Sequence, residues 1–270
     1  MKKVVYGTVR YYEDEATTDF LITKINRQVT IDGNYRYLNE NLFYKIFSFV
    51  LYYCIAIPVL LLITWFKGIK VYGRKNIRGL KTGYVMYINH TNPIDAFLAQ
   101  VRYARPRRGY IIANKDAVSI KGIGWLVKAL GTFPLPDTKM GLVNLTKAIG
   151  TILSDRKVLI IYPEAHVWNY YTGLRPFPLT SFKFAVNNHV PAVPVAATYR
   201  KPTGLLKDYK HPRMHVYVGK PIYEDLNLTT QENIQRMHDL TVEFILEKLR
   251  NPENVALFNY VKKGNSDFSD

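Results

Sequence analysis

The chain has 270 residues, of which 48% are hydrophobic and 21% charged, so it can bury a real core and is not a disordered chain. Its 37 lysines and arginines exceed its 21 aspartates and glutamates, giving a net charge of +16, which indicates an anionic partner such as nucleic acid or a membrane surface. The single cysteine, Cys54, excludes an internal disulfide and any zinc site built from several cysteines.

Residues 1–41 form a polar, charged arm that lacks the pattern of a secretory signal and to which no role is assigned. Residues 42–67 are predicted to be a membrane-anchoring helix, because Ile46–Phe66 contains no charged residue and would be roughly 30 Å long as a helix. A buried core helix would show the same pattern, and Pro58 also permits a bent helix that lies in the membrane plane.

The segment after this helix is strongly basic. Residues 67–81 carry six lysines and arginines and no acidic residue. By the positive-inside rule, the part of the chain that follows the helix is expected on the cytoplasmic side, where these charges would bind anionic lipid headgroups.

Residues 68–270 are predicted to form one α/β domain, with a mostly parallel sheet covered by flanking helices. Short apolar runs predict strands, and apolar residues at helical spacing predict helices. The expected strands are 84–88, 109–113, 157–161, 192–198 and 215–218, and the expected helices are 93–101, 123–130, 140–154, 179–188 and 229–250.

The segment 89–95, Asn-His-Thr-Asn-Pro-Ile-Asp, follows the first expected strand and opens the first expected helix, with Pro93 at the first helical position. A carboxylate from Asp95 that reaches Nδ1 of His90 would leave Nε2 free to accept a proton from a hydroxyl. The spacing alone fits equally well an acidic residue placed at a helix N-terminus for the dipole, beside a histidine with a structural role.

Four ordered blocks along the chain resemble the signatures of the glycerolipid acyltransferases, the family that includes 1-acylglycerol-3-phosphate acyltransferase. The resemblance covers roughly residues 70–225. Its blocks are Asn89-His90 with Asp95; residues 114–135, from Asn114-Lys115-Asp116 to Gly131-Thr132-Phe133-Pro134-Leu135; Tyr162-Pro163-Glu164; and residues 190–195, Val-Pro-Ala-Val-Pro-Val.

The resemblance implies direct transfer of an acyl group from a thioester of coenzyme A or acyl carrier protein to a hydroxyl, with His90 and Asp95 as the catalytic dyad. It implies a substrate-binding role for Asn89 and Glu164, and no tightly bound cofactor or metal. An acyl-enzyme is not expected, since the chain has no Gly-x-Ser-x-Gly elbow and Cys54 lies in the apolar segment.

Two arginines that the family uses near a phosphate are missing. Asp137 stands at the first of these positions, and Glu164 is followed by Ala-His-Val where the family has Gly-Thr-Arg. Arginine binds phosphate in a bidentate way, so nearby cations are candidates to replace the two residues. The candidates are Arg175, the favoured one, then Lys115, Lys139 and Lys183, and His166 is expected to contact the acceptor headgroup rather than a metal.

These observations predict an O-acyltransferase of phospholipid synthesis that acts on a lysophospholipid, with 1-acylglycerol-3-phosphate as the first candidate. The missing arginines leave open another acceptor, or a lipid-binding protein of the same fold without activity. A nucleic-acid binder is disfavoured because the chain has no recognisable binding module and the apolar segment accounts for the charge. The expected partners are therefore membrane phospholipid and an acyl thioester donor.

Overall fold

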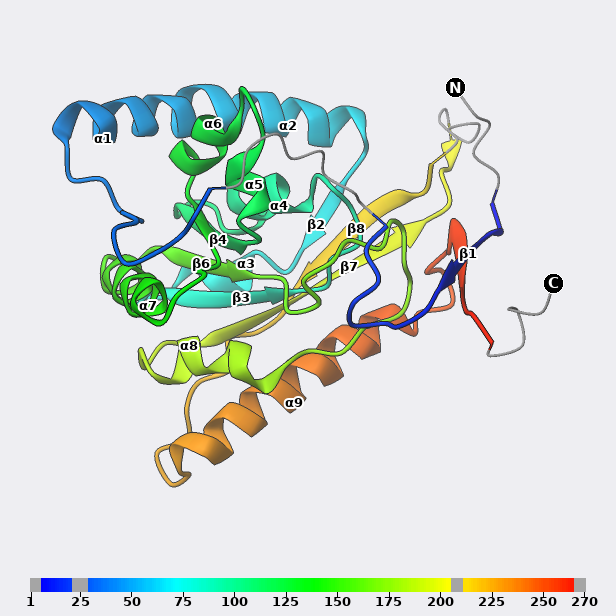
Figure 1. Cartoon of the computed structure of the whole chain (residues 1–270). Coiled ribbons are helices and arrows are strands. Elements are labelled where there is room, and N and C mark those ends of the chain that lie inside the picture. The colour runs from blue at the N-terminus through cyan, green and yellow to red at the C-terminus, as the bar shows by residue number, and fades with distance from the viewer. Residues whose placement is uncertain (1–5, 21–28, 205–210, 265–270) are drawn as a thin grey trace.

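The computed structural model describes residues 6–20, 29–204 and 211–264. Within these residues, the largest sheet has seven strands in the order β2-β8-β7-β3-β6-β4-β5, with helices on both faces (Figure 1). Its strands are β2 (Lys70–Tyr72), β3 (Tyr84–Ile88), β4 (Gly109–Ala113), β5 (Thr132–Pro134), β6 (Val158–Ile161), β7 (Ala192–Arg200) and β8 (Arg213–Val218).

The prediction of a mostly parallel, covered sheet is confirmed. Strands β3 to β7 run parallel, while β8 is antiparallel to β7, and β2 is parallel to β8. Strands β3 and β6 are buried at every position, as expected for strands with helices on both sides. In β8, buried residues alternate with half-buried ones, which matches its place near the edge of the sheet.

Helices α7 (Lys139–Ser154), α8 (Lys183–Val186) and α9 (Thr230–Leu249) cover one face of the sheet (Figure 1). Helix α7 buries Leu145 and Ile149 against this face, and α9 begins with the expected capping box between Thr229 and Glu232. Helix α4 (Asp95–Leu98), which continues as a π-helical turn Ala99–Tyr103, covers the other face. The remaining short helices are α3 (Lys75–Arg78), α5 (Asp116–Ser119), α6 (Gly124–Ala129) and the 3₁₀ turn Leu179–Phe182.

The prediction that a helix starts at Pro93 is wrong, because α4 begins at Asp95. The Asp95 carboxylate accepts hydrogen bonds from the backbone N–H groups of Thr91 and Asn92, at 3.0 and 2.7 Å. These bonds hold residues 91–94 in a turn. The delayed start leaves His90 outside the helix, at the tip of β3.

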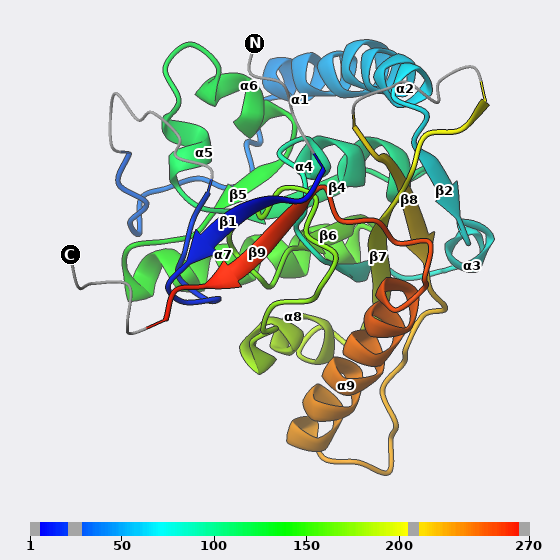
Figure 2. The ribbon, with the colours of Figure 1, turned by 90° about the vertical axis from the view of Figure 1, so that its right-hand side faces the viewer.

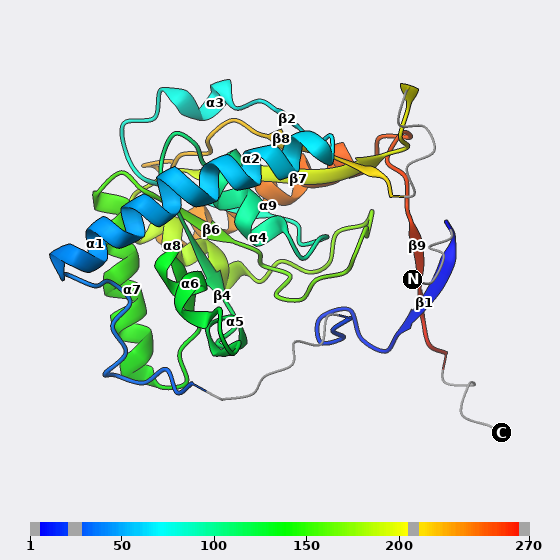
Figure 3. The same cartoon turned by 90° about the horizontal axis from the view of Figure 1, so that it is seen from above.

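The apolar segment forms one continuous helix from Leu42 to Phe66, 25 residues long. It consists of α1 (Leu42–Phe49), a π-helical stretch Val50–Ala56 and α2 (Ile57–Phe66), and Figure 3 shows it lying lengthwise across the domain. By length and composition it could cross a membrane.

Hydrogen bonds fix one side of this helix to the domain. The Tyr52 hydroxyl donates to the Gln100 carbonyl at 2.8 Å and accepts from the Gly109 N–H at 3.1 Å. The Ser48 hydroxyl donates to the Ala129 carbonyl at 2.6 Å. The other side is an exposed apolar face, formed by Leu42, Phe43, Ile46, Phe47, Phe49, Val50, Ile55, Val59, Leu62, Trp65 and Phe66.

Segments from the two ends of the chain form a second small sheet of two strands, which we call the terminal ribbon. Strand β1 (Thr8–Tyr12), from the predicted arm, pairs in parallel with β9 (Phe258–Lys262). Figure 2 shows this ribbon in front of the edge where the central strands end. The described parts of the arm, residues 6–20 and 29–41, therefore belong to the same compact structure as the domain that follows them.

Candidate active site

The predicted site residues follow the carboxyl ends of neighbouring parallel strands. His90 comes after β3, Glu164 after β6 and Lys115 after β4. Because these strands run in the same direction, the loops that carry these residues lie along one edge of the sheet, which is the common place for sites in open α/β sheets. Adjacent strands lie about 4.8 Å apart, so the ends of β3 and β4, two strands apart in the sheet, are separated by roughly 10 Å.

The His90 imidazole faces the Asp95 carboxylate. Nδ1 of His90 lies 3.6 Å from Oδ2 of Asp95, and the two side chains are 13% and 2% exposed. Nδ1 of His90 and Oδ1 of Asp95 are both buried without a hydrogen-bond partner in the described structure. A movement of the ring by less than 1 Å would bring the pair to hydrogen-bond distance, so the geometry suits a histidine whose tautomer the carboxylate sets.

Tyr162 holds both members of this pair, and the sequence prediction did not assign it a role. Its ring stacks on the His90 imidazole with 4.2 Å between centroids, and its hydroxyl donates to the Asp95 carbonyl at 2.8 Å. Burial raises the pKa of Tyr162 well above the ordinary value, so the hydroxyl stays protonated as a donor. The sequence feature that could have identified Tyr162 is its position at the end of a buried strand, directly before Pro163-Glu164.

Glu164 is buried and contacts the backbone of His90. Oε2 of Glu164 accepts from the His90 N–H at 3.0 Å and from Nη2 of Arg175 at 3.1 Å, while Oε1 accepts from the Arg175 N–H at 3.1 Å. Burial raises the pKa of Glu164, against the opposing effect of the Arg175 guanidinium. Both carboxylate oxygens are thus engaged within the protein, which points to a role in positioning the dyad.

Arg175, the favoured phosphate ligand, lies in the interior at 1% exposure. Besides Glu164, its guanidinium donates to the carbonyls of His166 and Glu15, the latter at 3.2 Å, and it lies over the Trp168 ring. A phosphate could reach Arg175 only if the surrounding loop opened.

Lys115 and His166 each have a carboxylate partner. Nζ of Lys115 lies 2.6 Å from Asp137, the residue that stands where the family has an arginine, and Nδ1 of His166 lies 3.2 Å from Asp19. Lys139, at the start of α7, and Lys183, at the start of α8, are exposed, and neither has an ion pair within the described residues.

Asn89 is buried and ties β3 to β7. Its side-chain amide donates to the Ala197 carbonyl at 3.0 Å, and its Oδ1 accepts from the Ala197 N–H at 2.8 Å. The structure therefore brings His90, Asp95, Asn89 and Glu164 together at one strand tip. In the described part of the chain, no group of three or more His, Cys, Asp or Glu residues could hold a metal ion.

The terminal ribbon packs against the loop that follows Glu164. Trp168 is fully buried, its indole N–H donates to the Thr18 carbonyl at 2.9 Å, and its ring stacks on Tyr260 of β9. The backbone N–H of Trp168 donates to the His90 carbonyl at 3.2 Å, and the backbone N–H of Tyr170 donates to the Thr91 carbonyl at 2.8 Å. Segments outside the predicted signatures thus support the backbone of the dyad.

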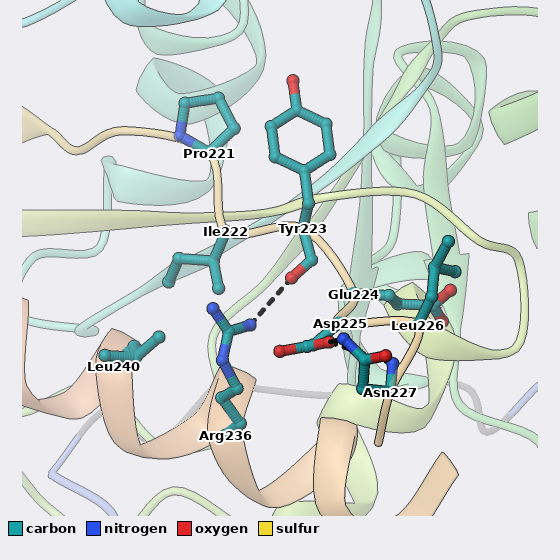
Figure 4. A pocket seen from close by; sticks show the side chains of 9 residues that line it. All are labelled: Pro221, Ile222, Tyr223, Glu224, Asp225, Leu226, Asn227, Arg236 and Leu240. Atoms are coloured by element: carbon teal, nitrogen blue, oxygen red, sulfur yellow. Dashed lines mark hydrogen bonds between the residues drawn. The ribbon is translucent and has the colours of Figure 1, made fainter. Parts of the chain in front are cut away.

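A separate recess of about 580 Å³ lies at the opposite edge of the sheet, between residues 221–227 and α9 (Figure 4). A bridge between Ile222 and Ala192 places it beside the start of β7, away from His90. Arg236 crosses the recess and donates to the Tyr223 carbonyl at 2.8 Å. This recess contains none of the residues predicted for the site.

Comparisons with known proteins agree with this fold. A family model described as Acyltransferase matches residues 68–198, which include the dyad, Lys115, Glu164 and Arg175. Among curated proteins, no sequence matches the chain. The crystal structure of the 1-acyl-sn-glycerophosphate (LPA) acyltransferase PlsC from Thermotoga maritima is similar, with 18% identity and a TM-score of 0.52 over 77% of this chain and 88% of that chain.

Proposed function

We propose that this chain, whose residues 68–198 match the acyltransferase family model, transfers a fatty acyl group from an acyl thioester to the hydroxyl of a lysophospholipid at a membrane surface. The observation that carries the proposal is the His90–Asp95 pair at the tip of β3, with 3.6 Å between its nearest atoms. A general base of this kind contributes about 10²- to 10⁴-fold to a rate.

In the proposed reaction, Nε2 of His90 takes the proton of the acceptor hydroxyl while the oxygen attacks the thioester carbonyl. The carbon–sulfur bond then breaks, the ester forms, and the imidazolium returns its proton to the leaving thiolate. Asp95 stabilises the imidazolium through Nδ1. Tyr162 and Glu164 keep the ring and the His90 backbone in place for this step.

We propose 1-acylglycerol-3-phosphate as the first acceptor to test, and acyl-CoA or acyl carrier protein as the donor. Lys115 supports this choice, because its side chain is one-third exposed and its partner Asp137 is equally accessible, so an incoming phosphate could compete for the ammonium group. Lys139 is a second accessible cation near the same end of the sheet.

We also propose that the exposed apolar face of the helix Leu42–Phe66 binds the membrane while the helix stays packed along the domain. Burying exposed apolar area contributes about 25 cal/mol per Å², so eleven large side chains on one face favour insertion into the bilayer interface. We further propose that this surface is the cytoplasmic one, because its anionic lipids would attract the basic residues that follow the helix.

The test is acyl transfer in detergent micelles, with labelled acyl-CoA and acyl carrier protein each offered with lysophosphatidic acid, lysophosphatidylglycerol or glycerol-3-phosphate. Transfer to lysophosphatidic acid that disappears in His90→Ala is the expected result. His189→Ala is a matched control, because His189 is an exposed histidine paired with Glu224.

Transfer only to another acceptor would overturn the choice of substrate and keep the mechanism. Full activity in His90→Ala, or no transfer to any acceptor by folded protein, would contradict the proposed reaction itself. Flotation with phosphatidylcholine vesicles tests the membrane face separately: Phe43→Glu/Trp65→Glu should lose binding, since both side chains are more than two-thirds exposed.

A further inference from the structure

Two basic segments meet at the edge of the sheet opposite the dyad. Residues 74–83 carry four lysines and arginines, residues 99–108 carry four arginines, and neither segment contains an acidic residue. Arg74 follows β2, which runs against the central strands, and Arg105 precedes β4, so both lie where the central strands begin. The fold thus collects cations from two separate segments at this amino edge.

Backbone contacts tie the two segments together. Nη2 of Arg74 donates to the Arg105 carbonyl at 3.4 Å. Arg107 donates to the carbonyls of Leu80 and Thr82 in the loop before β3. The loops are therefore held in contact although both are positively charged.

Two of the arginines in this region have structural roles. Arg107 is engaged by the two carbonyls of the neighbouring loop, and Arg108 donates to the Ser48 hydroxyl and the Ala129 carbonyl. The others form what we call the arginine cluster, consisting of Arg74, Arg78, Arg102 and Arg105.

The arginine cluster lacks compensating negative charge. Within the described residues, no carboxylate pairs with any of its four members. Nε of Arg74 and Nε of Arg102 are buried without a hydrogen-bond partner. Burial, with the nearby charges of Arg102, Arg105 and Arg78, lowers the pKa of Arg74. Partly buried like charges destabilise a fold unless an anion compensates them.

We propose that the arginine cluster is a binding site for a phosphate-bearing anion. Planar guanidinium groups with free N–H donors match phosphate oxygens in a bidentate way, and several of them together favour a group with two or more negative charges. A strand of five residues separates this edge from the dyad by about 16 Å, so the site is distinct from the place of acyl transfer.

Both a lipid headgroup and a soluble phosphate carry this chemistry, and the experiment distinguishes them. Full-length protein in neutral detergent is heated with and without inorganic pyrophosphate, and its flotation is measured with phosphatidylcholine vesicles with and without phosphatidylglycerol. The test variant is Arg102→Gln/Arg105→Gln. The matched control is Lys147→Gln/Lys262→Gln, which removes two exposed charges elsewhere.

In the wild type and the control, saturating pyrophosphate should raise the unfolding temperature by roughly 5 °C or more, and phosphatidylglycerol should increase flotation. The test variant should lose at least one of these responses. Loss of the pyrophosphate response alone assigns a soluble phosphate, and loss of the phosphatidylglycerol response alone assigns a lipid headgroup. Without any phosphate, the variant should unfold at a higher temperature than the wild type, because the repulsion is relieved.

The proposal is overturned if the test variant responds to pyrophosphate and to phosphatidylglycerol as the control does, or if neither probe affects the wild type. If the double variant does not fold, Arg78→Gln provides the same comparison at an exposed member of the cluster. None of these measurements depends on acyl transfer, so their outcome is independent of the proposed function.

Discussion

Two histidines in the site loops each face a carboxylate, and the two pairs differ in origin and burial. His90 and Asp95 are five positions apart, their side chains are 13% and 2% exposed, and Nδ1 of His90 has no hydrogen-bond partner. His166 takes its partner Asp19 from the N-terminal arm, and these side chains are 28% and 41% exposed at 3.2 Å. The first pair is the one we propose for catalysis, whereas the second joins a surface loop to the arm.

The difference shows why an ion pair alone does not identify a catalytic group. An exposed pair is screened by water and contributes at most about 1 kcal/mol to stability. In a buried pair, by contrast, the carboxylate that faces a ring nitrogen of the histidine favours the tautomer with the proton on that nitrogen. If this distinction is correct, substitutions in the first pair should change activity, and substitutions in the second should change little.

The largest effect is expected for Asp95→Asn. An amide cannot stabilise the imidazolium, so kcat should fall by about 10³-fold or more, with a small change in the acceptor KM. Steady-state transfer assays measure this, and circular dichroism checks the fold. Since Asp95 also accepts from the Thr91 and Asn92 N–H groups, Asp95→Ala should additionally lower the unfolding temperature. Unchanged kcat in Asp95→Asn would show that the first pair is structural.

The next largest effect is expected at Glu164, which lies two residues before His166 and accepts a hydrogen bond from the His90 N–H. Glu164→Gln leaves the Arg175 guanidinium buried without its counter-charge, which should destabilise the fold by about 3–5 kcal/mol. Denaturant unfolding measures the change. In Glu164→Gln/Arg175→Met most of the stability should return, because both buried charges are removed together. A single variant as stable as the wild type would mean that the pair is solvated in solution.

Much of this architecture could be predicted from the sequence, and most of what could not be predicted depends on contacts between distant segments. The five expected strands and the dyad depend on local features, namely apolar runs and a motif within seven residues. Other features join segments from distant parts of the chain, so no local pattern predicts them: the ribbon of β1 and β9, and the Asp19–His166 pair. The start of α4 is missed for a local reason: the Asp95 carboxylate accepts from the N–H groups of Thr91 and Asn92, and this turn outweighs the preference of proline for a first helical position.

A smaller effect is expected where the ribbon supports the loop. Tyr260 stacks on Trp168 with 4.9 Å between ring centroids, and its hydroxyl donates to the Asn169 carbonyl at 2.9 Å. Tyr260→Ala should cost about 2 kcal/mol and lower kcat several-fold, because Trp168 donates to the His90 carbonyl. Tyr260→Phe keeps the stacking, so it should retain kcat and lose only about 1 kcal/mol. Equal kcat in all three proteins would limit the ribbon to a role in stability.

The smallest effect is expected for the second pair itself. Asp19→Asn removes an exposed charge, so the free energy of unfolding should change by less than about 1 kcal/mol and kcat should stay near the wild-type value. If His166 contacts the acceptor headgroup, releasing it from Asp19 should lower KM for an anionic acceptor such as lysophosphatidic acid, and His166→Gln should raise it. Measuring KM with lysophosphatidic acid and with lysophosphatidylcholine shows whether these changes depend on headgroup charge, because only the first acceptor carries a net negative headgroup. Identical KM values in all variants would exclude His166 from the acceptor site, and a large loss of kcat in Asp19→Asn would remove the distinction between the two pairs.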